Sequence, residues 1–194
     1  MPGRLVLVRH GDTGWSRSGR HTGRTDVALD PEGRRQARRL ATRLGGHRFA
    51  DVLVSPALRA RETCAGAGFG AEARVVEDLH EWDYGDFEGR TTPEIQTQWP
   101  GWSLWHDGAP GGETPAQVAA RADRVLALAA RHAAAGDVLL FAHGHLLRVV
   151  AARWIGLDGA SGARLALDPA SISILGHERD TAVLERWNDT DEPL

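Results

Sequence analysis

Histidine, arginine and glutamate side chains recur just beyond short apolar runs of this sequence. Arg9 and His10 follow the first run directly, Arg59 lies a few residues beyond the second, Glu81 lies beyond the third, and His143 follows the fourth. In an open α/β sheet, ligands bind beyond the carboxyl ends of the parallel strands. If the four runs are strands, these five side chains converge at one edge of the sheet.

These residue types together suit the transfer of a phosphoryl group. A phosphomonoester is a dianion, and the guanidinium groups of Arg9 and Arg59 offer forked donors to its oxygens. A neutral imidazole is a competent nucleophile because its unperturbed pKa is about 6.5, so His10 would form a phosphohistidine intermediate. His143 would hold the phosphoryl oxygens from the far side. Glu81 would protonate the leaving alkoxide and later deprotonate the attacking water.

A metal site is the main alternative for the same stretch of sequence. His143 and His145 are candidate metal ligands, with Asp12 and Asp83 as carboxylates that would join them. A metal site needs several such ligands together, and the sequence has no run of the His-x-His-x-Asp type. We therefore predict a metal-independent site with no cofactor. Considered by itself, Arg59 could also be a solvent-exposed residue on the surface of a helix, with no role in binding or catalysis.

The elements that must position these side chains are short buried strands that alternate with helices. Continuous apolar runs without alternation are typical of strands buried on both faces of a parallel sheet. Such strands are predicted at 5–8, 52–54, 74–76 and 138–142, and a closing pair at 171–175 and 182–187. Capping residues and glycines predict the helices between them. These helices run from Asp30 to Gly45, onward from Ser55-Pro56, from Thr114 to Gly136, and from 146 to 155.

This alternation predicts an α/β fold, a three-layer α/β/α sandwich around a mostly parallel central sheet. The chain has 194 residues and no repeat or linker, so residues 1–194 are predicted to form a single domain. Residues 85–113 are rich in Gly, Trp and Pro and predict an irregular, lid-like insertion with a short helix at 92–98. Trp99, Trp102 and Trp105 either pack this lid or shape the mouth of the site.

The composition argues against several classes of partner. The formal net charge is −3, with 23 Lys+Arg against 26 Asp+Glu, so no basic excess points to nucleic acid or to an anionic membrane surface. No apolar run is long enough to span a membrane, and the run at 5–8 is too short for a signal peptide. The single Cys64 cannot form an internal disulfide, which fits a reducing compartment. We therefore predict a cytoplasmic protein.

The order and content of these motifs resemble the histidine phosphatase superfamily, also called phosphoglycerate-mutase-like, over roughly residues 4–187. The resemblance rests on the segments 7–13 (Leu-Val-Arg-His-Gly-Asp-Thr), 20–23, 55–63, 81–89, 112–114 and 142–145. It implies that Arg9, His10, Arg59 and His143 form the phosphate pocket, that His10 is phosphorylated, and that Glu81 is the proton donor. By position it also implies substrate contacts for Ser16, Thr22 and Gly23, although the family usually has Asn where Ser16 stands.

Two segments, 81–89 and 105–108, look like the branch of small bacterial acid phosphatases and fungal sedoheptulose-bisphosphatase-like enzymes. The chain lacks the tail with which phosphoglycerate mutases shield the phosphoenzyme, so hydrolysis of a small phosphorylated metabolite is expected. Mutase-type phosphoryl transfer and a non-catalytic regulatory module are the alternatives. The helix after His143 would add the N–H groups near Gly144 to the phosphate pocket. Arg148 would reach a second phosphate or a carboxylate, or is a surface charge. Family members are often dimers, so a homodimer is expected.

Overall fold

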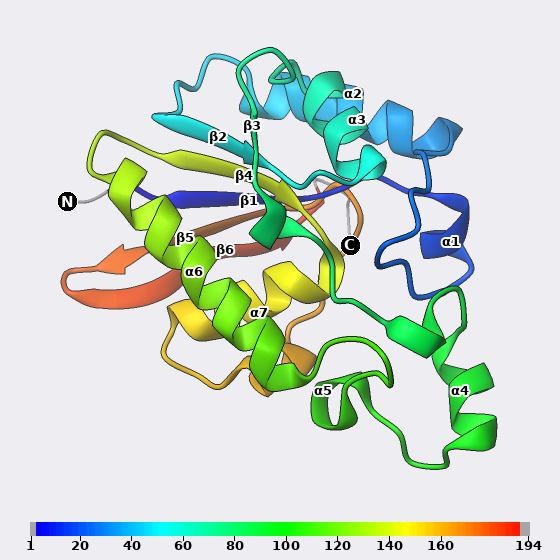
Figure 1. Cartoon of the computed structure of the whole chain (residues 1–194). Helices are drawn as coiled ribbons and strands as arrows, with labels where there is room; N and C mark the ends of the chain where they lie inside the picture. Colours follow the sequence, from blue (N-terminus) through cyan, green and yellow to red (C-terminus); the bar gives the residue numbers. More distant parts are fainter. Residues whose placement is uncertain (1–2, 191–194) are drawn as a thin grey trace.

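A computed structural model describes residues 3–190, and its centre is a sheet in the strand order β3-β2-β4-β1-β5-β6. The strands are β1 (Leu5–Arg9), β2 (Asp51–Val54), β3 (Arg74–Val75), β4 (Val138–Ala142), β5 (Ile172–Glu178) and β6 (Thr181–Asp189). The first four run parallel, whereas β5 is antiparallel to β1 and β6 is antiparallel to β5. The prediction of a mostly parallel sheet is therefore confirmed (Figure 1).

Strand β1 lies between β4 and β5, with Leu5 opposite Val138 and Arg9 opposite Ala142 in the parallel register. Its side chains from Leu5 to Val8 are at most 5% exposed, as expected for a strand covered on both faces. Strand β3 is shorter than predicted, and its two residues are exposed because it forms one edge of the sheet. The register places Arg9 at the carboxyl end of β1, where the chain leaves the sheet.

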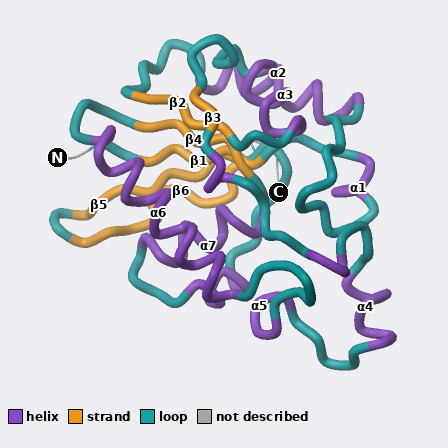
Figure 2. The backbone as a smooth tube through the Cα atoms, viewed as in Figure 1, coloured by secondary structure: helices purple, strands orange, loops and turns teal. Residues whose placement is uncertain are grey.

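Helices cover both faces of the sheet, which confirms the three-layer architecture (Figures 1 and 2). Helices α2 (Pro31–Leu44) and α3 (Leu58–Gly66) lie on one face. Helices α6 (Pro115–Ala133) and α7 (Gly144–Trp154) lie on the other. The alternating side chains of the strands divide accordingly: Val6 and Val8 pack toward α2 and α3, whereas Leu5 and Leu7 pack toward α6 and α7.

The capping residues behave as predicted at two helices and differently at a third. Asp30 accepts a hydrogen bond from the backbone of Gly33, and Thr114 forms a capping box with Gln117. The sequence predicted that the next helix begins directly at Ser55-Pro56, but helix α3 begins at Leu58. The Ser55 hydroxyl bonds to a histidine of the site and accepts the N–H of Ala57 at 3.3 Å, so it closes a turn before the helix, and Ala57 is the N-cap.

The segment 85–113 folds as a short irregular excursion below the sheet in Figure 1, at the right. It contains η2 (Gly85–Phe87), the predicted helix α4 (Thr92–Gln98) and the single turn α5 (Leu104–Asp107). Trp102 is buried and donates its indole N–H to the carbonyl oxygen of Gly108 at 2.9 Å, whereas Trp99 is exposed. The remaining short elements are α1 (Gly14–Arg17), η1 (Glu77–Leu79) and η3 (Gly159–Arg164).

Candidate active site

His10 follows β1 directly and is held in one orientation by its neighbours. Its backbone N–H donates to Ala142 at 3.0 Å, and its side chain is only 5% exposed. The ring nitrogen Nδ1 lies 2.8 Å from the carbonyl oxygen of Gly11. A carbonyl oxygen only accepts, so Nδ1 carries the proton of the neutral ring and Nε2 keeps a lone pair. Burial, together with the positive charges of Arg59 and Arg9, lowers the pKa of His10 well below its usual range, which favours this neutral form.

Arg59 and His143 form a buried pair beside the His10 ring. The rings of His10 and His143 are 5.2 Å apart between centroids. Arg59 Nε donates to His143 Nδ1 at 3.2 Å, so His143 in its neutral form carries its proton on Nε2, which lies 2.7 Å from Ser55 Oγ. Burial and the Arg59 charge lower the pKa of His143 well below its usual range. Both nitrogens of His143 therefore have protein partners in this structure.

The guanidinium of Arg59 is held by backbone carbonyls of the segment 22–25. Its NH2 group donates to Thr22 and Gly23 at 2.9 and 3.1 Å, and NH1 donates to Thr25 at 3.1 Å. Arg59 is 1% exposed, and burial lowers its pKa. The predicted phosphate fork thus lies next to the candidate nucleophile, but it faces the protein rather than the cavity described below.

Arg9 presents the opposite situation, because one of its donors has no partner. Its NH1 group donates to the carbonyl oxygen of Leu167, while Nε is buried and has no hydrogen-bond partner within residues 3–190. Burial lowers the pKa of Arg9. Gly144 packs closely against this side chain, since a Cβ at Gly144 would lie 3.3 Å from Arg9 Nε. A buried guanidinium with a spare donor beside a cavity is suited to bind an anion.

Glu81 occupies the loop after η1 and is fixed by three backbone N–H groups. Trp82 and Leu146 donate to Oε1 at 2.8 and 2.9 Å, and His145 donates to Oε2 at 3.0 Å. We expected the first N–H groups of the helix after His143 to face a phosphate. Two of them instead bind the Glu81 carboxylate, because this buried acid reaches the positive end of α7 from within the protein. Glu81 is therefore anchored at the start of α7.

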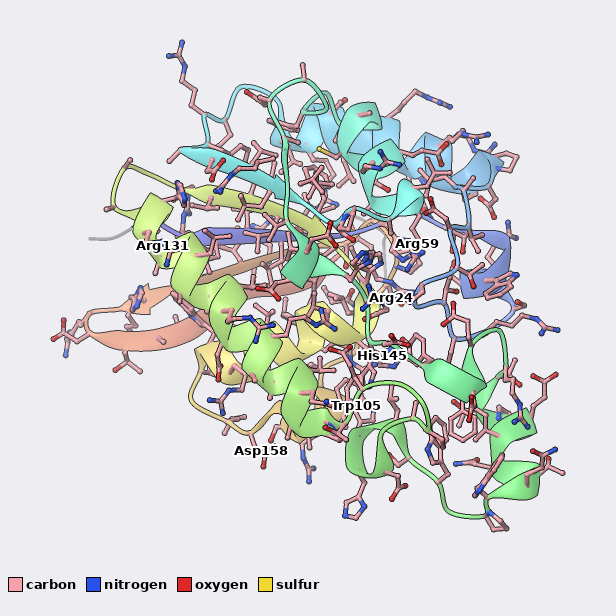
Figure 3. The ribbon with its side chains drawn as sticks, viewed as in Figure 1. Arg24, Arg59, Trp105, Arg131, His145 and Asp158 are labelled. Carbon is pink, nitrogen blue, oxygen red and sulfur yellow. The ribbon has the colours of Figure 1, made fainter. Side chains whose placement is uncertain are left out.

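A cavity of about 270 Å³ joins these groups. The residues that line it are Arg9, His10, Ser16, Gly19, Arg20, His21, Thr22, Glu81, Tyr84, Thr92, Gly144, His145, Arg148 and Leu167. The sequence predicted seven of them: Arg9, His10, Ser16, Thr22, Glu81, Gly144 and Arg148. Three other predicted residues, Arg59, His143 and Gly23, lie behind this lining. Figure 3 shows Arg59 and His145 toward the same end of the sheet, with Arg131 at the opposite end.

The residues at positions 16, 22 and 23 differ in what they offer a ligand. The Ser16 hydroxyl is part of the capping box of α1 and also donates to Asp12 at 3.2 Å. The Thr22 hydroxyl donates to the carbonyl oxygen of Arg20 at 3.2 Å. Gly23 is placed away from the cavity, and its N–H donates to the carboxylate of Glu88 at 2.9 Å. Ser16 and Thr22 thus border the cavity, whereas the backbone of Gly23 supports the segment that holds Arg59.

Arg148 is a half-buried wall of the cavity. Its Nε donates to Gly162 at 2.9 Å and NH2 donates to Ala163 at 3.1 Å, which ties it to η3. Its guanidinium carbon lies 4.4 Å from the centre of the Trp105 ring, a cation–π arrangement. Trp105 therefore supports a cavity-lining arginine, which fits the interpretation that this tryptophan shapes the mouth of the site.

Sequence reasoning assigned no substrate role to three aromatic side chains that line the same cavity as His10. Tyr84 Oη lies 2.6 Å from His145 Nδ1, and the ring of His21 lies 4.7 Å from that of Tyr84. Burial lowers the pKa of His21 to about 4 and raises that of Tyr84 well above its usual range. His21, Tyr84 and His145 all lie within the motifs on which the family resemblance rests. Their position in these motifs was therefore the sequence feature that could have identified them as cavity residues. Side-chain direction decides which motif residues reach the cavity, and the sequence does not give it.

The four residues considered as alternative metal ligands do not form a metal-binding cluster. They are His143, His145, Asp12 and Asp83. Both nitrogens of His143 are engaged as described, Asp12 accepts from Gln36 at 2.9 Å, and Asp83 pairs with Arg24 at 3.2 Å. Within residues 3–190, no three side chains of His, Cys, Asp or Glu are arranged to hold a metal ion. No helix of that range is long and apolar enough to cross a membrane.

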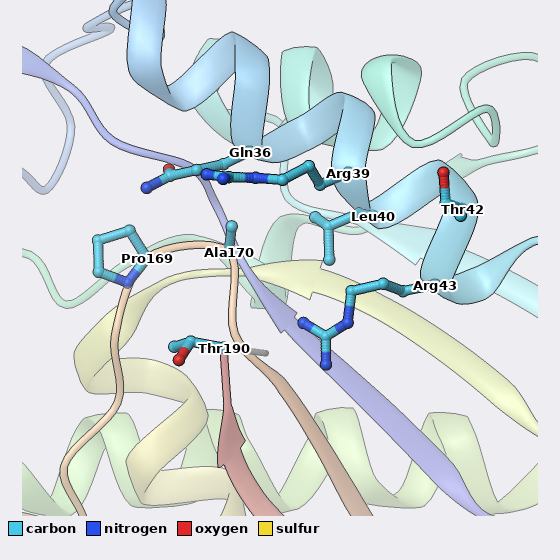
Figure 4. Close-up of a pocket in the computed structure, with 8 residues that line it drawn as sticks. All are labelled: Gln36, Arg39, Leu40, Thr42, Arg43, Pro169, Ala170 and Thr190. Atoms are coloured by element: carbon cyan, nitrogen blue, oxygen red, sulfur yellow. The ribbon is translucent and has the colours of Figure 1, made fainter. Parts of the chain in front are cut away.

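A second cavity, of about 280 Å³, lies beside α2 and the turn before β5 (Figure 4). Its lining includes Gln36, Arg43 and Ala170, and none of the predicted site residues. It touches the site only through its walls: Gln36 is bonded to Asp12, and the N–H of Ala170 donates to the carbonyl oxygens of Arg9 and His10. This cavity is therefore separate from the one that contains the His10 ring.

Comparison with known proteins agrees with this geometry. The model of the histidine phosphatase superfamily (branch 1) matches residues 5–190. An acid phosphatase of Mycobacterium tuberculosis is 46% identical over 186 residues, which cover 93% of this chain and 91% of the relative. A sedoheptulose 1,7-bisphosphatase of Saccharomyces cerevisiae is 38% identical over 185 residues, which cover 79% of this chain and 68% of the relative. A solved structure of a Mycobacterium tuberculosis protein has a TM-score of 0.93 at 43% identity, covering 98% of this chain and 99% of the other.

The chain therefore belongs to the histidine phosphatase superfamily. This confirms the family, the fold and the phosphatase class that the motifs predicted. The resemblance to small bacterial acid phosphatases and to the fungal sedoheptulose bisphosphatase is confirmed as well.

Proposed function

We propose that this protein hydrolyses phosphomonoesters through a phosphohistidine on His10. The observation that carries this proposal is the ring of His10, whose Nδ1–H is donated to Gly11 while Nε2 is left with its lone pair. Arg9 lines the same cavity as this ring, and its buried Nε has no hydrogen-bond partner among residues 3–190. A neutral nucleophile next to a spare cationic donor is the arrangement that phosphoryl transfer requires.

The reaction proceeds in two steps. His10 Nε2 attacks phosphorus, the bond from phosphorus to the ester oxygen breaks, and Glu81 gives its proton to the leaving alkoxide. A water molecule then attacks the phosphohistidine, Glu81 takes a proton from it, and inorganic phosphate leaves with His10 restored. Arg9 binds the phosphoryl oxygens in both steps. Arg59 and His143 stabilise the charge of these oxygens from behind the nucleophile.

A mutase must return the phosphoryl group to a second substrate before water reaches the phosphoenzyme, whereas a hydrolase transfers it to water. We favour hydrolysis for this chain on the basis of its relatives. Relatives of both kinds are similar to this chain, but the acid phosphatase shares 46% identity and a 2,3-bisphosphoglycerate-dependent phosphoglycerate mutase of Mesorhizobium japonicum shares 31%. Adding bisphosphoglycerate as a primer distinguishes the two activities. Release of phosphate faster than isomerisation of phosphoglycerate supports the hydrolase, and the reverse order supports the mutase.

We propose a small phosphorylated metabolite as the substrate, with Arg148 as a contact for a second anionic group. Arg148 lines the cavity in a fixed orientation over Trp105. A relative is named for a bisphosphate substrate. Phosphate release should be measured over a panel of sugar phosphates, sugar bisphosphates, nucleotides and phosphoglycerates. Arg148→Gln should raise KM for substrates with a second anionic group and leave KM for para-nitrophenyl phosphate unchanged. An equal effect on both would argue against this contact.

Substitution of the nucleophile tests the proposal directly. His10→Ala should abolish hydrolysis of para-nitrophenyl phosphate while the circular dichroism spectrum and melting temperature stay close to those of the wild type. His106→Ala is the matched control, because the side chain of His106 is 90% exposed in α5. Chelators should leave the activity intact, and vanadate, which mimics five-coordinate phosphorus, should inhibit it. Wild-type turnover by His10→Ala, or rescue of a chelated enzyme by zinc, would refute the mechanism.

We further propose that the chain acts as one domain in the cytoplasm and that it forms a homodimer. Fractionation of the native host would test the compartment, and sedimentation equilibrium would test the dimer. A single calorimetric transition is expected for one domain.

A further inference from the structure

The loop that carries Glu81 has little regular structure of its own. Residues 80–84 lie between η1 and η2, and they belong to no strand or helix. The carboxylate must nevertheless stay within hydrogen-bonding reach of the leaving oxygen, because general acid catalysis depends on that distance. The three amide groups bound to Glu81 fix the carboxylate itself. The main chain of the loop therefore needs other partners.

Arg121 of α6 supplies these partners from behind the loop. Its NH1 group donates to the carbonyl oxygens of Asp78, at 2.9 Å, and of His80, and its NH2 group donates to the carbonyl oxygen of Glu81 at 3.2 Å. One side chain thus binds three carbonyls within four consecutive residues. Arg121 is 7% exposed and does not line the cavity, so it reaches the reaction only through the main chain of this loop.

Glu113 completes the arrangement on the other side of Arg121. Arg121 Nε donates to Glu113 Oε1 at 2.9 Å, and NH2 donates to Oε2 at 2.6 Å. The same Oε2 accepts the N–H of Asp83 at 2.9 Å, and the carbonyl oxygen of Glu113 accepts the Trp82 indole N–H at 2.9 Å. A guanidinium has five N–H donors, and each of those of Arg121 has an acceptor here. The pair is neutral in sum and clamps the chain on both sides of Glu81.

We propose that Arg121 and Glu113 are positioning residues that hold Glu81 at the distance required for proton transfer to the leaving group. This inference rests on the proposed function, because it takes Glu81 as the general acid. A pair of this kind acts on one step more than on the rest of the reaction. Its loss should slow those substrates that need a proton on the leaving oxygen, and spare those that do not.

The test compares two substrates with different leaving groups. Para-nitrophenolate departs without a proton, whereas the alkoxide of ethyl phosphate needs one. Glu81→Gln is measured first and should lower kcat/KM for ethyl phosphate about 100-fold more than for para-nitrophenyl phosphate. Arg121→Lys keeps the charge but replaces the planar fork with a single ammonium group. It should lower kcat/KM for ethyl phosphate about 10-fold more than for para-nitrophenyl phosphate, as expected for a small displacement of the acid.

Two further variants keep the result interpretable. Glu113→Asp retains the carboxylate but withdraws it from Arg121 and from the N–H of Asp83, and it should show the same selective loss as Arg121→Lys. Arg124→Met is the matched control: Arg124 lies one turn further along α6 and binds the exposed carboxylate of Asp78 rather than the loop carbonyls. It should change neither substrate.

The outcomes separate the two proposals. If Glu81→Gln slows both substrates equally, the assignment of Glu81 as general acid is wrong. If Glu81→Gln is selective but Arg121→Lys and Glu113→Asp slow both substrates equally, or slow neither, the positioning role is overturned. Selective loss in both positioning variants, with unchanged behaviour of Arg124→Met, supports the inference.

Discussion

Arg9→Met should make the unliganded protein slightly more stable while it removes most of the activity. The structure gives the reason for the first half. In the absence of a ligand, Arg9 Nε is a buried donor without a partner among the described residues, and leaving a donor unpaired costs about 1–3 kcal/mol. Burial also disfavours the charge of Arg9, as the lowered pKa indicates. Methionine has a similar unbranched stem and no polar group to leave unpaired.

The substitution also has a cost, which sets the net magnitude. It removes the hydrogen bond from NH1 to the carbonyl oxygen of Leu167, and a bond to a charged group contributes about 1.5–3 kcal/mol. Relief of the unpaired donor and loss of this bond are of similar size, so relief of the buried charge decides the sign, and we expect a net gain of about 1 kcal/mol. For a chain of this length, 1 kcal/mol corresponds to a rise in Tm of about 2–4 °C.

Activity should move in the opposite direction. Arg9 lines the cavity that contains the His10 ring, and loss of one such cationic group from a transition-state site typically lowers kcat by about 100- to 1000-fold. Thermal unfolding and hydrolysis of para-nitrophenyl phosphate measure the two effects on the same preparation. Arg131→Met, at the exposed surface of α6 far from the site (Figure 3), is the control and should change neither value. A variant of Arg9 that melts well below the wild type, or that keeps full activity, would refute this reasoning.

Three further predictions concern pH and ligands. Protonation would inactivate His10, and burial together with the charges of Arg59 and Arg9 lowers its pKa. The acid limb of kcat/KM, corrected for ionisation of the substrate, should therefore fall below pH 6.5. An acid limb at or above that value would contradict a neutral, buried His10 ring. His21 has a pKa of about 4 in the folded protein and about 6.5 when unfolded. The unfolded chain therefore binds more protons between these two pKa values, so the free energy of unfolding should decrease as pH falls from about 6.5 to 4, by up to about 3 kcal/mol for this group. Denaturant unfolding of His21→Asn should show a smaller decrease over the same pH range. A decrease equal to that of the wild type would exclude His21 as a cause. Phosphate at 100 times its Kd should stabilise the wild type by about 2.7 kcal/mol, seen as a rise in Tm that Arg9→Met reduces; an equal rise in the variant would place the anion elsewhere.

The fold could be predicted in most of its parts because local sequence determines them. The run from Leu5 to Val8 has no polar position, which is typical of a strand covered on both faces. Asp30 with Pro31, and Thr114 with Gln117, are capping patterns whose partners lie within three residues. The start of α3 could not be predicted in the same way. Ser55 would cap a helix by its local sequence, but its hydroxyl accepts the N–H of Ala57 in a turn before the helix and also bonds to His143, which is 88 residues away.

The site was predictable as a location and less so as a set of contacts. The rule that ligands bind beyond strand ends brought Arg9, His10 and Glu81 to one edge, and the cavity lies there. The sequence does not reveal that Arg59 is held by the carbonyls of segment 22–25, or that the amide of Gly23 is taken by Glu88. Those choices depend on which buried donors and acceptors remain after the chain has folded, because nearly every such group finds a partner.

In the proposed reaction, His10 Nε2 becomes covalently bonded to phosphorus during each turnover. The enzyme should be mixed with substrate, quenched within milliseconds under alkaline denaturing conditions that preserve phosphohistidine, digested, and analysed by mass spectrometry. We expect one phosphate on the peptide that contains His10, a label that disappears when the substrate is exhausted and is absent in His10→Ala. A phosphate on another residue, or an active enzyme that never carries a label under conditions that preserve it, would exclude His10 as the nucleophile.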